Sequence, residues 1–356
     1  MQRDAIIGCI LGTAVADALG LPYEGVSPNR ASRLLGPPDR YRFFFGRGMI
    51  SDDTEHTCMV AQSMIEALSN SGENVDVDRF TKRFAWRLRW WILAFPAGVG
   101  KATARAGIKL WLGAKPQNAG VFSAGNGPAM RAAIFGAAID DVSSMLELVR
   151  ASTRLTHTDP KAEFGAVAVA LAAKHAREHI SPDANLWLEQ VVDTLGEDAA
   201  ELVDLLRQAI QSVHSGDSTQ TFAQSLGLTH GVTGYTYHTV PVAIHAWLSH
   251  PRDFSRAVAT IIECGGDADT TAAIVGGIVG AAVGRDGIPQ PWIKGIAEYP
   301  RSVSWMQKLG ESLADAVDRK PPAPIPAINP IAVLLRNLLF LLIVLFHGFR
   351  RLAPPY

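Results

Sequence analysis

The sequence predicts an all-α fold. Apolar residues recur at helical spacing over residues 54–68, 161–180 and 196–214, so each stretch places them on one face of a helix. No stretch shows the sustained alternation of apolar and polar residues that predicts strands. Clusters of glycine and proline separate the helical stretches and predict loops. We therefore expect one compact helical domain over residues 1–318 of the 356-residue chain.

The first helical stretch, residues 1–20, contains the apolar run and the Ala-Val-Ala before Asp17 that are typical of a signal peptide. Asp4, however, interrupts the basic head that such a peptide needs. The run is also rich in glycine and other small residues, which suit a helix packed closely inside a protein. We therefore expect a core helix of a cytoplasmic protein and no export signal.

Two helices are preceded by pairs of acids. Ser51, Asp52 and Asp53 stand directly before one, and Asp267 and Asp269 stand before a helix of small apolar residues. Helix capping explains one acid of each pair, because a single N-cap side chain suffices. The second acid of each pair needs another role. Two such clusters, if they meet in the fold, form an all-oxygen site for two small divalent ions.

Aromatic and sulfur side chains are expected mainly inside the domain. Trp86, Trp90 and Trp91 fall in a helical stretch and are expected to pack in the core and at helix interfaces. The sequence has three cysteines, Cys9, Cys58 and Cys264. They share no ligand-like spacing and form no even framework, which favours core thiols in a reducing compartment and argues against zinc.

The chain ends in a proline-rich segment and an apolar tail. Residues 319–330 are expected to form an extended linker, and residues 331–356 an apolar tail helix. The uninterrupted apolar run is short for a bilayer-spanning helix, and Arg336 would be costly in mid-bilayer. A bilayer anchor, an interfacial helix and a helix packed on the domain all stay open, with membrane association through residues 331–349 as one possibility.

Composition limits the classes of partner. Hydrophobic residues make up 48% and charged residues 19% of the chain, which provides a large core. The formal net charge is -1. A protein that binds nucleic acid normally has a basic surplus or a basic face, so we expect no direct nucleic-acid binding.

Five blocks, in order, give the chain a resemblance. They are GCILGTAVADALGLPYEG, SDDT, AGNGPAMRAA, TRLTHTDP and ECGGDADTTAAIVGGIVGA. Together they resemble the ADP-ribosylglycohydrolase family, which includes the dinitrogenase reductase-activating glycohydrolases and the ADP-ribosylarginine hydrolases. The resemblance implies a single compact domain of orthogonally packed helices. It also implies a binuclear Mg²⁺ (or Mn²⁺) centre that removes ADP-ribose from a modified protein side chain.

The resemblance assigns roles to individual residues. It implies as metal ligands Ser51, Asp52, Asp53, Asp267, Asp269 and Thr270. It implies as substrate-binding residues Ser123, Gly125, Asn126, Gly127, Met130, His157 and Tyr237, with Tyr235 beside the last. Glu24 matches the acid next to the metals, and Glu24 or Asp53 is expected to be the general base. The family usually has Thr at Ser51 and Gly at Ala16, and both substitutions keep the needed hydroxyl or small size.

The main functional hypothesis is therefore a metal-dependent hydrolase of the N- or O-glycosidic bond that joins ADP-ribose to a protein. Its partner would be an ADP-ribosylated protein or ADP-ribose itself. Cleavage at the anomeric carbon passes through an oxocarbenium-like state, which needs an activated water and help for the leaving group. Two alternatives are a catalytically weak ADP-ribose-binding module and a membrane-associated scaffold that acts through the tail.

Overall fold

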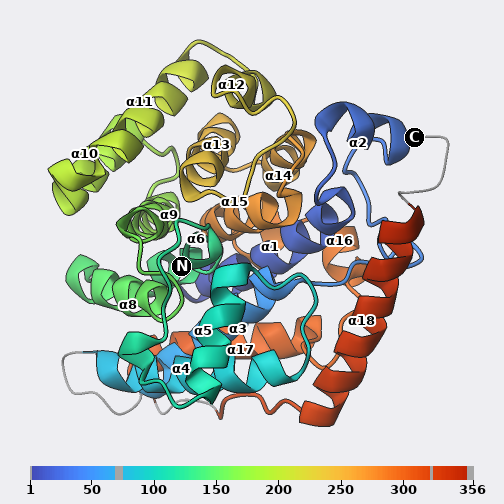
Figure 1. The fold of residues 1–356 in the computed structure, drawn as a ribbon. Coiled ribbons are helices and arrows are strands. Elements are labelled where there is room, and N and C mark those ends of the chain that lie inside the picture. Colours follow the sequence, from blue (N-terminus) through green and yellow to red (C-terminus); the bar gives the residue numbers. More distant parts are fainter. Residues whose placement is uncertain (1, 69–74, 321–323, 351–356) are drawn as a thin grey trace.

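The computed structural model describes residues 2–68, 75–320 and 324–350, and within them the fold is all-α (Figure 1). The helices are α1 (Gln2–Gly20), α2 (Pro28–Leu34), α3 (Asp52–Leu68), α4 (Val77–Leu93), α5 (Lys101–Trp111), α6 (Gly127–Met130), α7 (Ala133–Ala138), α8 (Val142–Arg154), α9 (Pro160–Glu178), α10 (Ala184–Leu195), α11 (Ala200–His214), α12 (Thr219–Ser225), α13 (Thr236–Ser249), α14 (Phe254–Glu263), α15 (Ala268–Val283), α16 (Gln290–Gly295), α17 (Val303–Val317) and α18 (Pro330–Arg350). Short 3-10 turns are η1 (Leu21–Tyr23), η2 (Pro116–Asn118), η3 (Glu197–Ala199) and η4 (Arg285–Gly287). Neighbouring loops join only through isolated β-bridges in these ranges.

Several helices begin at an N-cap whose side chain accepts an amide hydrogen from the first turn. These caps are Asp76, Asp141, Asp159, Asp183, Ser218, Asp253 and Ser302. Such a cap satisfies a donor that has no partner inside the helix, and each contributes about 1 kcal/mol. The helix starts are thus encoded locally, while apolar packing decides where the helices lie.

The centre of the molecule is the antiparallel pair of α1 and α15 (Figure 1). Glycines let the two backbones touch: a side chain added at Gly12 would overlap the backbone of Gly276, and one at Gly8 would overlap that of Gly280. Gly20, at the end of α1, lies equally close to the first residues of α15. The C-terminal end of α1 therefore meets the N-terminal end of α15, where two of the expected metal ligands lie.

The apolar N-terminal segment is a core helix, as expected. Residues 2–23 are long and apolar enough to cross a membrane by composition, yet the segment is fully buried in the protein. The three cysteines are buried and carry free thiols. The stretch before the tail contains the expected irregular segment: after α17, residues 324–329 have no regular secondary structure.

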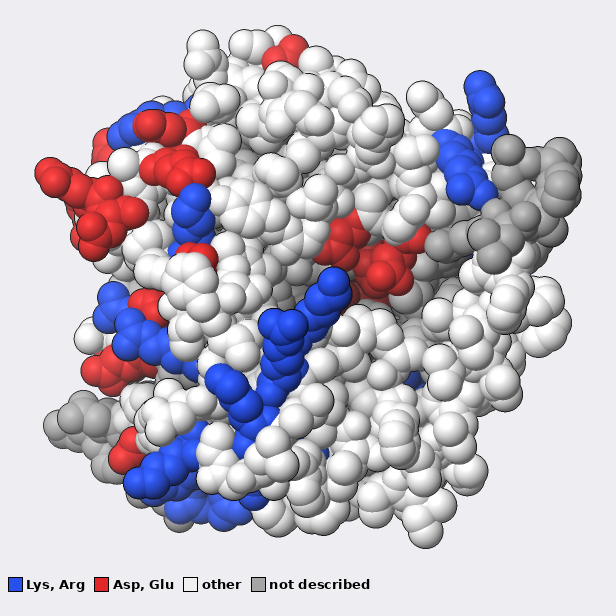
Figure 2. Space-filling model, viewed as in Figure 1, with Lys and Arg blue, Asp and Glu red and all other residues white. Residues whose placement is uncertain are grey.

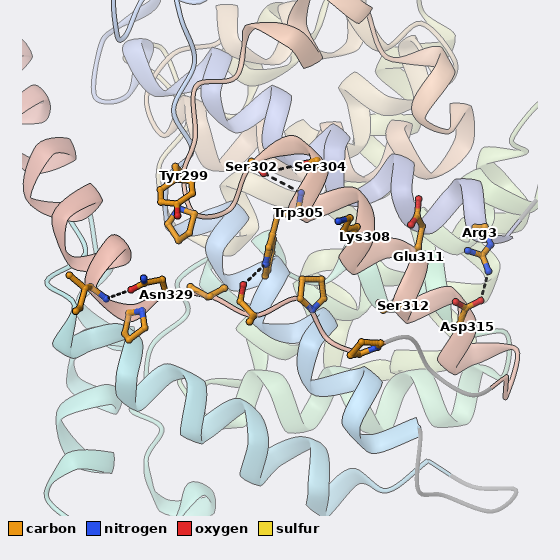
Figure 3. A pocket seen from close by; sticks show the side chains of 17 residues that line it. Arg3, Tyr299, Ser302, Ser304, Trp305, Lys308, Glu311, Ser312, Asp315 and Asn329 are labelled. Carbon is orange, nitrogen blue, oxygen red and sulfur yellow. Dashed lines mark hydrogen bonds and ion pairs between the residues drawn. The ribbon is translucent and has the colours of Figure 1, made fainter.

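The described part of the proline-rich segment lies along α17 (Figure 3). The indole Nε1 of Trp305 donates a 3.1 Å hydrogen bond to the carbonyl oxygen of Ala327, and Ile325 and Ile328 pack against the core. A groove of about 990 Å³ lies between the two segments. The segment thus leads the chain across the domain to α18.

Helix α18 packs on the domain with one face, as the alternative of a packed helix predicted, and its other face is exposed. Val333 and Phe340 are buried, and the ring of Phe340 lies 5.4 Å from that of Phe43. Asn337 Nδ2 donates a 2.8 Å hydrogen bond to the carbonyl oxygen of Ala94, and His347 Nε2 lies 2.8 Å from that of Phe43. The expected tail helix extends to residue 356, but residues 351–356 lie outside the described part of the chain.

Candidate active site

Asp17 of α1 organises the start of α3. Its Oδ2 accepts hydrogen bonds from the backbone amides of Ser51 (2.9 Å) and Thr54 (3.3 Å), and from the hydroxyl of Thr54. The carboxylate thus caps α3 from a different helix, and its negative charge interacts favourably with the helix N-terminus. α3 begins at Asp52, two residues earlier than the periodicity predicted, so Asp52 and Asp53 lie in its first turn.

Two glycines shape the loop before α15. Gly265 (φ 66°) and Gly266 (φ 79°) are left-handed, a conformation that only glycine adopts without strain. Gly266 also bonds a neighbouring loop, since its carbonyl accepts from Gly25 N at 2.7 Å and its amide donates to Val26 O at 3.0 Å. The loop ends at Asp267, which precedes α15, while Asp269 lies inside the first helical turn. Capping was expected of one acid of this pair, and the structure puts Asp267 at the N-cap position, where its side chain makes no capping hydrogen bond.

The two acid clusters meet. Ser51 Oγ donates to Asp53 Oδ2 at 2.9 Å, and Thr270 Oγ1 from α15 donates to the same oxygen at 3.3 Å. Thr270 N in turn donates to Asp269 Oδ1 at 2.9 Å. Ser51, Asp53, Asp269 and Thr270 are all buried. The first turns of α3 and α15 therefore form one continuous set of oxygen atoms.

The charges of this acidic cluster, Asp17, Asp52, Asp53, Asp267 and Asp269, are not neutralised. None of the five forms an ion pair with any Lys or Arg that the structure describes. Burial raises the pKa of Asp17 to about 6. Burial raises the pKa of the other four above their ordinary value, and repulsion between carboxylates adds to the shift in Asp52, Asp53 and Asp269.

Glu24 lies at the edge of the acidic cluster. It follows η1 at the end of α1, in the loop that Gly25 and Gly266 join to the start of α15. Its charge raises the pKa of both Asp52 and Asp269, so the carboxylate is close to the first turns of α3 and α15. Unlike Asp53, Glu24 is exposed. It is therefore more accessible to solvent and to a ligand than Asp52 and Asp267, which are half-buried.

The donor set suits hard divalent cations. Asp53 Oδ1 and Asp17 Oδ1 are buried and accept no hydrogen bond from any described residue. Buried anionic oxygens without a donor are costly unless a cation compensates them. Across the described ranges, no three Asp, Glu, His or Cys side chains have the spacing of a formed metal site.

The glycine-containing loop of residues 123–127 lies beside the acids. Asn126 Nδ2 donates to Asp267 Oδ2 at 2.6 Å and to Thr239 Oγ1 at 2.9 Å. Ser123 Oγ accepts from Gly125 N at 3.3 Å. Added side chains at Gly125 and Gly127 would press on the ring of His157, so the loop and the histidine are in contact. The structure thus gathers this part of the implied substrate-binding set, and Met130 follows it, buried in α6.

A buried arginine holds that loop in place. The Arg131 guanidinium donates to the carbonyl oxygens of Gly127 (3.1 Å) and Ser152 (2.9 Å), and to Thr156 Oγ1 (2.7 Å). Thr156 Oγ1 also lies 2.8 Å from His157 Nδ1. Burial lowers the pKa of His157 to about 3, so this imidazole is neutral at physiological pH.

The tyrosine pair lies one loop further out. Tyr235 is half-buried and bridges to Gly125, whereas Tyr237 is only 2% exposed. Lys161 Nζ donates to the Tyr235 hydroxyl at 3.0 Å and lies over the ring of Tyr237. The structure therefore places both tyrosines near the loop of residues 123–127, with Tyr235 the more accessible.

The surface of this region is acidic and hollowed. Figure 2 shows acidic side chains in a depression at the middle of the face, where the ends of α1 and α15 lie in Figure 1. Basic side chains lie directly beside the depression (Figure 2).

The segment before Ser51 is held by a buried ion pair that the sequence did not reveal. Ile50 N donates to Glu298 Oε2 at 3.2 Å, and Ile50 O accepts from a guanidinium nitrogen of Arg336. Glu298 and Arg336 pair with each other through two hydrogen bonds, at 2.7 and 2.8 Å. Both backbone groups of Ile50 are thus fixed by this pair, which we call the Ile50 clamp. One of its members comes from α18.

Sequence analysis also missed Asp17 and Arg131 as parts of the site. Each is an ionisable residue in a stretch of apolar or small neighbours, and that is a signal for a buried functional or structural charge. No comparable local signal marked Glu298. Its role follows from a contact with Arg336 and Ile50, which lie far away in the sequence.

Comparison with known proteins agrees with the geometry. A family model described as ADP-ribosylglycohydrolase matches residues 1–323. An uncharacterised protein of Archaeoglobus fulgidus is 32% identical over 297 residues, covering 82% of this chain and 90% of that protein. The ADP-ribosyl-dinitrogen reductase glycohydrolase of Rhodospirillum rubrum is 27% identical, with 82% and 90% covered. ADP-ribosylhydrolase ARH3 of Xenopus tropicalis is 26% identical, with 85% and 93% covered.

A solved structure shares the fold. The ADP-ribosylglycohydrolase-related protein complex has a chain that superposes with a TM-score of 0.59 at 24% identity, covering 89% of this chain and 99% of that one. The all-α architecture and the meeting of the two acid clusters are consistent with the family model that matches residues 1–323. This chain belongs to the ADP-ribosylglycohydrolase family.

Proposed function

We propose that the protein is a hydrolase that removes ADP-ribose from a modified protein side chain, using two divalent cations, Mg²⁺ or Mn²⁺. Family membership makes it a hydrolase of glycosyl bonds. The metal centre, the kind of bond and the protein substrate are parts of the proposal. It rests above all on the buried acidic cluster, whose charges no described Lys or Arg neutralises and whose Asp53 Oδ1 accepts no hydrogen bond.

The residues at the first turns of α3 and α15 would hold the cations. Ser51, Asp52 and Asp53 supply oxygens from one side, and Asp267, Asp269 and Thr270 supply them from the other. Asp17 stays behind this set, because its hydrogen bonds to the start of α3 occupy Oδ2. Bound divalent cations supply Lewis acidity that orients the ribose and makes a water molecule more acidic.

Glu24 is the better candidate for the general base. It is exposed at the edge of the acidic cluster, whereas Asp53 is buried and has Ser51 and Thr270 bonded to one oxygen. A base must reach the proton that it removes, so an accessible carboxylate next to the acidic cluster fits this role. Asp53 then serves as a ligand.

The loop of residues 123–127 would bind the diphosphate and ribose. Its glycines allow the backbone to approach a ligand closely, and Asn126 links the loop to Asp267. The neutral imidazole of His157 lies against the same glycines and offers a hydrogen bond without a charge. Tyr235 is placed to contact the far end of ADP-ribose.

The buried free thiols support a reducing location, and we propose that the enzyme is cytoplasmic. The proposal on partners is an ADP-ribosylated protein, and the composition does not favour nucleic acid.

The test is release of free ADP-ribose from proteins modified at arginine or serine, and from ADP-ribosylated nucleic acid. We expect turnover with Mg²⁺ or Mn²⁺, none in excess chelator, and a loss of at least about 100-fold in Asp267→Asn. Asp286→Asn is the matched control, because that aspartate is almost fully exposed after α15. Full activity in chelator would disprove the metal requirement. Tight binding of ADP-ribose without release from any substrate would instead indicate a binding module.

A further inference from the structure

Helix α18 turns polar side chains toward the domain and apolar side chains toward solvent, which is the reverse of an ordinary surface helix. Its polar side chains Arg336, Asn337 and His347 all bond to the domain. Over residues 331–349, whose side chains the structure describes, its outer face is apolar, with Ile331, Leu335, Leu338, Leu342, Leu345 and Phe349 between 45 and 69% exposed. The positions that flank this stripe, Leu334, Leu339, Leu341 and Phe346, are also exposed leucine or phenylalanine. Such a helix is unsuited to face water along its whole length of about 30 Å.

The apolar surface continues onto α4 and α5. Asn337 bonds the carbonyl of Ala94, and the next residue, Phe95, is 67% exposed. A cavity of about 540 Å³ between α4 and the start of α18 is lined by Trp86, Trp90 and Val333, among others. Sequence analysis expected these tryptophans in the core and at helix interfaces, and Trp90 does pack against Trp111 of α5. Trp91 is buried, but Trp86 and Trp90 are each 50% exposed.

Two loops beside α18 each carry an exposed phenylalanine. Phe45 (φ 47°) and Phe95 (φ 53°) have left-handed conformations that are unusual for a bulky residue. Phe45 and Gly46 (φ 78°) are the two central residues of a tight turn closed by two hydrogen bonds between Phe44 and Arg47, and such a turn favours a left-handed backbone at both positions. The turn leaves the Phe45 side chain 95% exposed.

The same side of the molecule is basic. Residues 79–139, which cover α4 from its third residue and all of α5, contain ten Lys and Arg and no Asp or Glu, and Asp78 in the first turn of α4 is the acid that precedes them. Exposed among them are Lys82, Arg83, Lys101, Arg105 and Lys115. Figure 2 shows basic side chains along the lower edge, where α4 lies in Figure 1, and a wide uncharged surface where α18 lies. Tryptophan beside lysine and arginine is typical of the boundary between lipid headgroups and acyl chains.

We propose that the outer face of α18, together with Phe45, Phe95 and the exposed side of α4 and α5, forms a surface that docks on an anionic lipid bilayer. α18 lies in the plane of the membrane, with its leucines among the acyl chains. It does not span, because its inner face remains packed on the domain through Phe340 and the Ile50 clamp. The tryptophans lie at the headgroups, and the lysines and arginines neutralise the lipid phosphates.

A bilayer fits this surface better than a second copy of the chain. Protein interfaces carry about one hydrogen bond per 100–200 Å² and a polar rim. The outer stripe of α18 offers no side-chain donor or acceptor, and its flanks are apolar too. Hydrocarbon requires no such groups. α18 also lies beyond residue 323, where the match to the family model ends, so the family's reaction does not account for it.

The test is flotation of the full-length protein with vesicles of phosphatidylcholine alone, or with one third phosphatidylglycerol. We expect binding to the anionic vesicles that weakens with salt, and at least a tenfold loss in the double variant Leu338→Glu/Leu342→Glu. Lys82→Glu/Lys115→Glu should weaken binding to anionic vesicles. Controls are Ile180→Glu, at an 82% exposed position before α10, and Arg207→Glu on α11.

Thermal midpoints establish that each variant is folded. Unchanged binding of Leu338→Glu/Leu342→Glu would overturn the proposal, as would full-length protein that fails to float with either vesicle. Sedimentation velocity tests whether a second copy of the chain is the partner instead. If the wild type is a dimer that does not bind vesicles, and Leu338→Glu/Leu342→Glu is a monomer, a second copy covers this face.

Discussion

Asp17 has two functions that oppose each other. As an acceptor for the first amides of α3 it stabilises the helix start, but as a fifth buried carboxylate it increases the repulsion in the acidic cluster. A residue that served α3 alone could be replaced by asparagine or serine. Retaining an acid here supports a site built to attract positive charge.

Glu24 provides the sharpest test at the residue scale. Glu24→Gln removes a proton acceptor while keeping shape and hydrogen-bonding capacity. We expect kcat to fall about 100-fold or more, with an unchanged thermal midpoint and unchanged affinity for ADP-ribose in calorimetry. Glu189→Gln, at an exposed position on α10, is the control. If Glu24→Gln keeps the wild-type turnover, the base is another carboxylate, and Asp53 is the next candidate.

The sequence predicted these residues unevenly. The pairs Asp52/Asp53 and Asp267/Asp269 were found because local capping could not explain two acids at one helix start. Asp17 was overlooked, since its partners Ser51 and Thr54 lie more than thirty positions away and no local pattern links them. A single charge in an apolar helix is the one sign that a sequence offers for such a residue.

At the scale of elements, the contact between α1 and α15 fixes the distance between the two halves of the acidic cluster. Gly276→Val adds a side chain where the backbone of Gly12 and the side chain of Ala16 already lie. We expect it to lower the free energy of unfolding by about 3 kcal/mol, through overpacking. We also expect weaker Mn²⁺ binding, because the ends of the helices move apart.

Urea unfolding and manganese titration of the folded protein would measure the two effects of Gly276→Val. Gly348→Val, at a position in α18 with open space around it, is the matched control and should change neither quantity. Normal manganese affinity in a destabilised Gly276→Val protein would show that the acidic cluster does not depend on the close helix contact.

The Ile50 clamp makes α18 part of the support of the site. Arg336→Gln leaves Glu298 buried without its cation, and loss of one partner of a buried pair costs about 3–5 kcal/mol. Because Ile50 precedes Ser51, we also expect Mn²⁺ affinity to fall about tenfold below the wild-type value. Leu335→Ala, at a 62% exposed position on the same helix, is the control.

Two results would separate the clamp from general stability. Arg336→Lys keeps the charge but not the two-pronged geometry, so it should recover part of the thermal midpoint and less of the metal affinity. If Arg336→Gln binds manganese as the wild type does, measured well below its thermal midpoint, the clamp supports only the fold.

For the whole molecule, pH should couple metal binding to stability. Raised carboxyl pKa values mean that the folded protein holds these protons more tightly than the unfolded chain, so their contribution to stability is lost as pH rises. For Asp17 the loss spans pH 3.8 to about 6. The buried histidines have lowered pKa values and act in the opposite sense. The pH dependence of the total free energy of unfolding therefore does not report on the carboxyl groups alone.

The increase in stability on adding Mn²⁺ does report on the carboxyl groups of the acidic cluster, because protons compete with the cation for the same oxygens. We expect the rise in thermal midpoint on adding Mn²⁺ to be larger at about pH 8 than at about pH 5. Asp53→Asn should show little increment at either pH. An equal increment at both values in the wild type would contradict the raised pKa values.

The overall architecture was largely predictable, and the tail was not. Periodicity of apolar residues is a local property and predicted the helices of residues 54–68 and 161–180 to within a few positions. The packing of α18 depends on Arg336 meeting Glu298 and on His347 meeting Phe43, which are pairs distant in sequence. Composition alone could not distinguish this helix from a membrane anchor.

The glycine contact of α1 with α15 also has a consequence during synthesis. α1 leaves the ribosome before α15, and the two helices are more than two hundred residues apart in the chain. At about 5–20 residues per second, α1 waits on the order of 10–50 s with its apolar surface without this partner. The nascent chain therefore depends on chaperones or provisional contacts throughout that interval. No fragment that stops before α15 can assemble the acidic cluster, so the catalytic function arises only after α15 has been synthesised.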